Sequence, residues 1–65
     1  MREFKRFYNE TAPFDHELMQ ILDIAKTEGR SVELTWFEYP NWCKVIAHPD
    51  NTLNDLRKQA RVYDY

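Results

Sequence analysis

The chain has 65 residues and a formal net charge of −2, with 43% hydrophobic and 15% aromatic residues. A chain of this length buries only about 60% of the surface that its unfolded form exposes, which leaves no room for a deep internal pocket. The acidic balance argues against a general nucleic-acid binder, because proteins that neutralise phosphates are usually basic. We therefore expect one small globular domain spanning residues 1–65.

The expected location is the cytoplasm. No apolar run is long enough to cross a bilayer, and the charged N-terminus lacks the apolar stretch of a signal peptide. Cys43 is the only cysteine, so no internal disulfide can form. An unpaired cysteine favours a reducing compartment.

The first ten residues fit two kinds of element. Phe4, Phe7 and Tyr8 have the spacing of one helical face. Phe4, Arg6 and Tyr8 also alternate as the residues of a strand do. The segment 9–13 ends either element, because its proline disfavours helix in the residue before it. Residues 1–10 therefore add either a third strand or a short helix.

Residues 14–28 predict an amphipathic helix. Asp15 or Thr11 is the expected N-cap, since their oxygens accept hydrogen bonds from the first turn. Gly29, the only glycine, stands where a left-handed C-terminal stop is expected. At 100° per residue, the apolar stripe consists of Phe14, Leu18, Ile21 and Ala25.

Residues 31–39 and 41–48 alternate between apolar and polar side chains, which predicts a β-hairpin. A two-residue loop of Pro40 and Asn41 separates the side chains into an apolar core face, which includes Cys43, and a second face. The expected pairs are Trp36 with Val45 and Leu34 with Ala47 on the core face, and Tyr39 with Trp42, Phe37 with Lys44, Thr35 with Ile46 and Glu33 with His48 on the second face.

A last helix follows the turn at residues 48–51. Asn51 or Thr52 is the expected N-cap, and Asp55 supports the first turn. The predicted fold is a small α+β domain of helix, β-hairpin and helix, preceded by the N-terminal segment. The apolar stripe of the last helix is Leu53, Leu56, Ala60 and Tyr63.

The chain offers little for catalysis or metal binding. Cys43, His16 and His48 are the only soft ligands, whereas a structural zinc ion needs four groups. A single glycine excludes the loops that cradle phosphates. Cys43 is expected to be buried between Trp36 and Val45, without the electropositive surroundings of a reactive thiol. We expect a protein that is not an enzyme and uses no metal, cofactor or small-molecule substrate.

The second hairpin face is the candidate site. A contiguous apolar patch in water usually marks a contact surface, and interface cores are rich in Trp, Tyr and Phe. Residues 1–10 offer a different outcome, because they could fold over this face and bury it. The expected partner-binding residues are Phe37, Tyr39, Trp42 and Ile46, with Lys44 and Arg57 as rim charges.

These features predict a protein-interaction module: a regulator, inhibitor or accessory factor that binds another protein or a second copy of itself. Small phage and mobile-element products that bind host enzymes are similar to this chain in size and in having few candidate sites for chemistry.

The alternative is a nucleic-acid-binding domain. Arg57, Lys58 and Arg61 share one helix flank, and Lys44 stands beside the aromatic residues, so phosphate contacts could combine with base stacking. A solvated helix flank explains the same charges. The stretch 52–60 resembles the closing stretch of small HicA-like ribonuclease toxins, and the helix–hairpin–helix order is similar to the double-stranded-RNA-binding fold. The Gly-Ser-His motif of those toxins does not occur here, and we treat the likeness as a shared local pattern.

Overall fold

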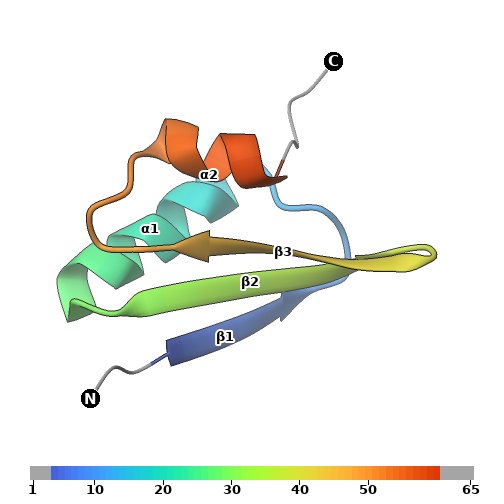
Figure 1. The fold of residues 1–65 in the computed structure, drawn as a ribbon, viewed down its shortest axis with the longest axis horizontal. Coiled ribbons are helices and arrows are strands. Elements are labelled where there is room, and N and C mark those ends of the chain that lie inside the picture. The colour runs from blue at the N-terminus through green and yellow to red at the C-terminus, as the bar shows by residue number, and fades with distance from the viewer. Residues whose placement is uncertain (1–3, 61–65) are drawn as a thin grey trace.

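A computed structural model describes residues 4–60 of the chain, with the side chain of Phe4 excepted (Figure 1). The small α+β class is confirmed. The element order is β-α-β-β-α, so the N-terminal segment, for which the sequence left a strand or a short helix open, contributes a strand. The predictions for Arg61 and Tyr63 fall outside the described residues. The elements are β1 (Phe4–Asn9), α1 (Asp15–Glu28), β2 (Ser31–Glu38), β3 (Asn41–Ala47) and α2 (Leu53–Ala60).

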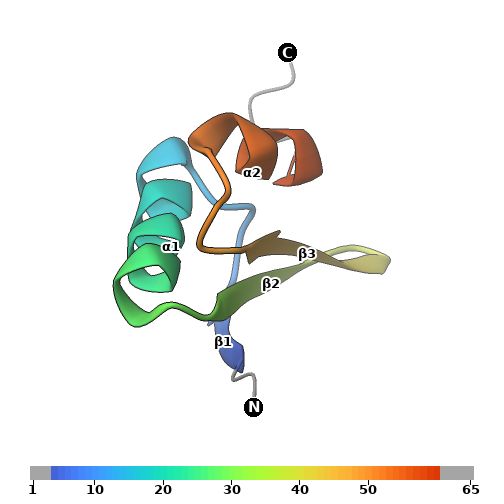
Figure 2. The ribbon, with the colours of Figure 1, turned by 60° about the vertical axis from the view of Figure 1, so that its left-hand side comes forward.

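The three strands form one sheet in the order β1-β2-β3. β1 runs parallel to β2, whereas β2 and β3 form an antiparallel hairpin. Figure 2 shows that α1 and α2 lie on the same side of the sheet. The described residues therefore form two layers, and neither of their two helices covers the other face of the sheet.

The hairpin register differs from the prediction by two residues. Trp36 pairs with Cys43 rather than with Val45, and Leu34 takes Val45 as its partner. The loop consists of Tyr39 and Pro40, joined by a cis peptide bond, instead of Pro40 and Asn41. Because side chains alternate with a period of two, this shift leaves every residue that remains paired on its predicted face, while Tyr39 moves into the loop.

The core lies between the helices and the inner face of the sheet. Trp36, Leu18 and Leu56 are among its largest fully buried side chains. They come from β2, α1 and α2, so the core joins both layers. The buried hydrophobic residues are Leu18, Ile21, Leu22, Ala25, Val32, Leu34, Trp36, Val45, Ala47 and Leu56.

The ends of α1 agree with the prediction at one terminus only. Phe14 is the N-cap residue, instead of Asp15 or Thr11, and its N–H donates to the Glu17 carboxylate at 2.9 Å. At the other end, Gly29 has φ 67° and its N–H donates to the Ala25 carbonyl at 2.8 Å, as a left-handed C-cap does.

The start of α2 is capped as expected. The N–H of Asp55 donates to the Thr52 hydroxyl oxygen at 3.3 Å, and the N–H of Thr52 donates to the Asp55 carboxylate at 2.9 Å. Asn51 stabilises the preceding turn, where its side-chain oxygen accepts from the N–H of His48 at 2.9 Å. Within residues 4–60, neither helix is long and apolar enough to span a bilayer.

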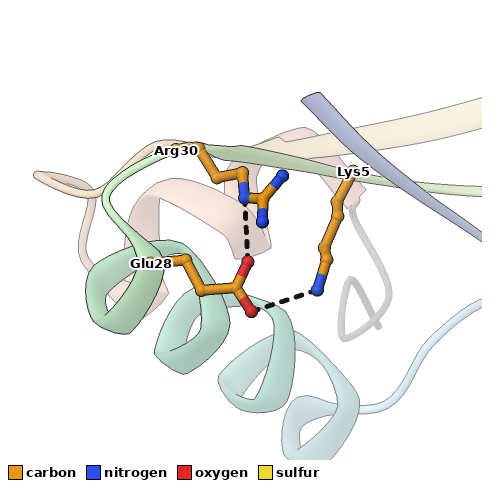
Figure 3. A network of polar contacts seen from close by, with 3 residues as sticks. All are labelled: Lys5, Glu28 and Arg30. Carbon is orange, nitrogen blue, oxygen red and sulfur yellow. Dashed lines mark hydrogen bonds and ion pairs between the residues drawn. The ribbon is translucent and has the colours of Figure 1, made fainter. Parts of the chain in front are cut away.

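One polar network connects β1 to the C-terminal end of α1 (Figure 3). The Glu28 carboxylate accepts from Lys5 Nζ at 3.0 Å and from Arg30 Nε at 2.8 Å. The hydrogen bond from Lys5 holds the pKa of Glu28 below its usual value. All three side chains are partly exposed, so the network orients β1 without adding much stability.

Candidate functional site: an exposed aromatic sheet face

The face of the sheet opposite the helices, here called the outer face, collects side chains from all three strands. Residues paired across strands place their side chains on the same side of a sheet, so the register assigns each residue to a face. The outer face consists of Arg6 and Tyr8 from β1, Glu33, Thr35 and Phe37 from β2, and Trp42, Lys44 and Ile46 from β3.

Four aromatic side chains, here called the aromatic row, run from this face to the hairpin loop in the order Tyr8, Trp42, Phe37 and Tyr39, the last of which lies in the loop. Successive ring centroids lie 6.3, 5.1 and 6.4 Å apart, and each pair meets edge to face. The residues are 67, 66, 43 and 88% exposed in the same order. With about 200 Å² for each full side chain, the row exposes roughly 500 to 600 Å², which is as large as the largest patch of a typical monomer.

The alternative in which residues 1–10 bury this face is wrong. β1 lies beside β2 in the plane of the sheet, so it widens the face and leaves Trp42 exposed. Phe7 points to the helix side, where its register partner Leu34 is buried. Tyr8 and Arg6 point outward and become part of the site.

Charged groups flank the aromatic row. Arg6 Nη2 lies 3.2 Å from Glu33 Oε1, and Glu33 is only 4% exposed. Lys44 is exposed and makes no ion pair within residues 4–60. These groups line a shallow depression of about 380 Å³ together with Tyr8, Thr35, Trp42 and Cys43. The depression therefore combines two aromatic rings with two cationic side chains, of which Arg6 is paired with Glu33.

The structure brings together five of the six predicted site residues. Phe37, Tyr39, Trp42 and Lys44 are exposed around the outer face, where Ile46 is partly buried. Arg57 lies in the helical layer instead, where its Nε and Nη2 donate to the two Asp15 carboxylate oxygens at 3.1 and 2.5 Å.

Sequence reasoning missed Tyr8 and Arg6 as members of the site. Their alternation with Phe4 was the available signal, since it indicated a strand with these side chains on one face. β1 pairs with β2 in the plane of the sheet and does not fold over the hairpin. This pairing depends on contacts between residues far apart in the sequence, which the alternation of side chains does not specify.

A serine and a histidine meet at the other end of the hairpin. Ser31 Oγ lies 2.7 Å from His48 Nδ1, one residue beyond the last register pair. Ser31 is buried, so its hydroxyl is poorly placed for nucleophilic attack on a substrate. The adjoining depression of about 570 Å³ has Pro49 as its one apolar side chain. This contact has the geometry of a structural hydrogen bond that joins the ends of β2 and β3.

Cys43 is partly exposed, whereas burial was expected. Its side chain lies on the helix side with Trp36, and Sγ donates to Glu38 Oε1 over 3.6 Å. Loss of solvent raises the pKa of the Cys43 thiol, and the bond to Glu38 raises it further. The thiol is therefore protonated and weakly nucleophilic at neutral pH. Among the described residues, no three His, Cys, Asp or Glu side chains gather where they could hold a metal ion.

Comparison with protein-family models, with curated proteins and with solved structures found no match.

Proposed function

We propose that this protein is a non-catalytic interaction module that binds another protein through the outer face of its sheet. The observation that carries the proposal is the aromatic row, which leaves large rings of Tyr8, Trp42 and Tyr39 in water. Buried aromatic side chains would be worth far more to stability than exposed ones. In a chain this short, aromatic side chains that lie outside the core contribute the most free energy when a partner protein covers them.

The arrangement of the site matches the anatomy of protein interfaces. Trp42 has a ring neighbour on each side, Tyr8 and Phe37, and forms the centre of the row. Interfaces place Trp and Tyr at their centres, with charged residues at the rim. Lys44 and Arg6 occupy that rim position here. Such a module acts by occupying a surface of its partner, as a regulator, inhibitor or accessory factor does, and its single cysteine suits the cytoplasm.

The test is a binding measurement with two matched variants. A partner captured with the wild-type chain is titrated by calorimetry against wild type, Trp42→Ala and Met19→Ala. Met19 is also a large exposed side chain, but it lies on α1 in the other layer. Trp42→Ala is expected to weaken binding by about thirtyfold or more, as truncation of a central hot-spot residue does, and Met19→Ala to leave it unchanged. Equal affinities for all three proteins would refute the proposal.

A second candidate function is binding of single-stranded nucleic acid on the same face. Arg6 and Lys44 stand beside Tyr8 and Trp42, a combination that supports phosphate contacts and base stacking. The Arg57 guanidinium supports it less, since it is directed to Asp15 in the helical layer. Fluorescence anisotropy with short single-stranded DNA and RNA decides between the candidates. Affinity that falls steeply with salt favours nucleic acid, and absence of binding at low salt removes this candidate.

A further inference from the structure

The two edges of the sheet differ in how their backbone groups are satisfied. At the β3 edge, Gln59 of α2 covers Ile46: its Oε1 accepts from the Ile46 N–H at 3.0 Å, and its Nε2 donates to the Ile46 carbonyl at 2.8 Å. β1 forms the other edge. Figures 1 and 2 show β1 on the side of the sheet away from α2, and within residues 4–60 its only neighbouring strand is β2. An uncovered edge strand is a template for pairing with another strand.

The register identifies which groups of β1 face the open edge. Because Ile46 uses both backbone groups for Gln59, its register partner Glu33 must turn its own groups toward β1. In a parallel pair, a residue whose backbone groups point toward the neighbouring strand lies opposite a residue whose N–H and C=O point away from the pair. Arg6 lies opposite Glu33, so its N–H and C=O point away from β2. Tyr8, two residues further along β1, has the same orientation. The N–H and C=O groups of Arg6 and Tyr8 therefore point out from the open edge.

A side-chain contact agrees with this assignment. The Thr35 hydroxyl donates to the Phe7 carbonyl at 3.2 Å, which places the Phe7 carbonyl on the β2 side of β1. Phe7 thus contributes its backbone to the internal ladder, while its neighbours in β1 remain available to an added strand.

We propose that β1 pairs antiparallel with β1 of a second copy of this chain, across a two-fold axis at Phe7, to form one six-stranded sheet. In this register, Arg6 lies opposite Tyr8 of the partner subunit, and each pair exchanges two backbone hydrogen bonds. Phe7 lies opposite Phe7 of the partner subunit. A two-fold axis makes the interface self-complementary, which is the commonest form of homodimer.

Charge selects this register over its nearest competitor. An axis at Arg6 would also keep the two helix sides together, but it places Arg6 opposite Arg6 of the partner subunit. Like charges directly opposite destabilise a strand pair. The axis at Phe7 instead sets each Arg6 guanidinium against the ring of Tyr8 of the partner subunit, which is a favourable cation–π arrangement.

The helices leave room for this pairing. Adjacent strands lie about 4.8 Å apart, so the two β2 strands of the dimer would be about 14 Å apart. Since the backbone of α1 lies close to β2 and β3 and not to β1, the two α1 helices would be separated by roughly the same distance, beyond the 8–10 Å or so of closely packed helices. The gap lies beside a depression of about 120 Å³ whose apolar walls are Phe7, Ile21, Ile24 and Leu34. Phe7 of the partner subunit enters the gap there.

The pairing leaves the outer face open. A two-fold axis perpendicular to the sheet keeps both helical layers on one side and both outer faces on the other. The dimer therefore presents two aromatic rows on one continuous surface. The edge pairing does not depend on the function proposed for that surface.

The first test is sedimentation equilibrium from micromolar to millimolar concentration with two phenylalanine variants. Phe7 and Phe37 are 37 and 43% exposed, so they are matched in residue type and exposure, but only Phe7 lies at the proposed axis. We expect the wild-type chain to form a dimer. In Phe7→Lys, like charges meet at the axis, so the dimer dissociation constant should rise by about tenfold or more. In Phe37→Lys, the dimer dissociation constant should stay unchanged. A monomer at every concentration, or a dimer that Phe37→Lys weakens as much as Phe7→Lys does, overturns the proposal.

The second test needs no variant and so does not depend on how Phe7→Lys folds. Amide hydrogen exchange of the wild-type chain is measured by NMR at low and high concentration. The amides of Arg6 and Tyr8 are expected to become protected as concentration rises, while the amide of Phe7 is protected throughout. Unprotected Arg6 and Tyr8 amides at a concentration where the mass doubles would overturn the proposal.

Discussion

Tyr8 and Trp42 meet edge to face with ring centroids 6.3 Å apart, although their strands, β1 and β3, lie on opposite sides of β2. On β2, Tyr8 is paired with Thr35 and Trp42 with Phe37, two residues further along, so the two rings meet on a diagonal across the strand. The N-terminal strand thereby becomes part of the same surface as the hairpin. A change in β1 is expected to affect the site through this contact.

The two tryptophans are expected to respond oppositely to truncation. Trp36 is 2% exposed and Trp42 66% exposed. Trp36→Ala should lower the free energy of unfolding by about 3–5 kcal/mol, enough to unfold a domain this small, whereas Trp42→Ala should cost about 1 kcal/mol through its lost ring contacts. Urea unfolding followed by far-ultraviolet circular dichroism measures both. A loss in Trp42→Ala as large as that in Trp36→Ala would place Trp42 in the core and contradict the site assignment.

Gln59 is expected to protect the β3 edge. Gln59→Ala removes both hydrogen bonds to Ile46 and should lower the free energy of unfolding by about 1–2 kcal/mol. The amide of Ile46 should then exchange faster with solvent. Lys58→Ala, at the exposed neighbouring position, is the control and should leave both quantities unchanged. If the Ile46 amide exchanges at the wild-type rate in Gln59→Ala, the side chain does not cover the edge.

Arg6 is expected to stabilise the fold, because its guanidinium pairs with the Glu33 carboxylate. Arg6→Ala leaves Glu33, which is 4% exposed, without its guanidinium partner. We expect a lower free energy of unfolding, because the Glu33 carboxylate loses a charged hydrogen-bond donor. Adding Glu33→Gln should recover part of that loss, because the amide carries no charge to leave unpaired. Urea unfolding of the two single variants and the double variant forms the cycle. Additive losses would show that the two side chains do not interact.

Local patterns predicted much of this fold. The helical stripe of residues 14–28 and the two hairpin faces follow from periods of 3.6 and two residues, which are properties of the chain itself. The hairpin register could not be predicted in the same way. Registers that differ by two residues keep Trp36 on the same face, so alternation does not distinguish them.

Contacts between distant segments account for the remaining errors. Arg57 was placed at the rim of the aromatic face, but it bonds to Asp15, 42 residues earlier in the chain. Asp15 was a candidate N-cap, but Phe14 takes that position and the Asp15 carboxylate turns to Arg57. Neither helix pattern indicates that the two side chains meet, because their partners are chosen only when α1 and α2 pack together.

The Asp15–Arg57 contact gives the fold a dependence on acid pH. The hydrogen bonds from Arg57 hold the pKa of Asp15 below its usual value of 3.8, and contacts with Thr52 and Lys5 likewise lower the pKa values of Asp55 and Glu28. A carboxyl whose pKa is lower in the folded state binds fewer protons there than in the unfolded chain. Its contribution is therefore complete above the unfolded value and is lost as the pH falls through the folded one.

We expect the midpoint of thermal unfolding to be level near neutral pH and to fall below about pH 4. Asp15→Asn should lower the midpoint at neutral pH, since Arg57 loses its charged partner, and should make the decline in acid shallower. Asp23→Asn, an exposed position on α1, is the control and should follow the wild-type curve. Calorimetry from neutral pH down to pH 2 or so, beneath the usual Asp value, measures all three proteins. If wild type and Asp15→Asn decline in parallel, Arg57 does not stabilise the charged form of Asp15.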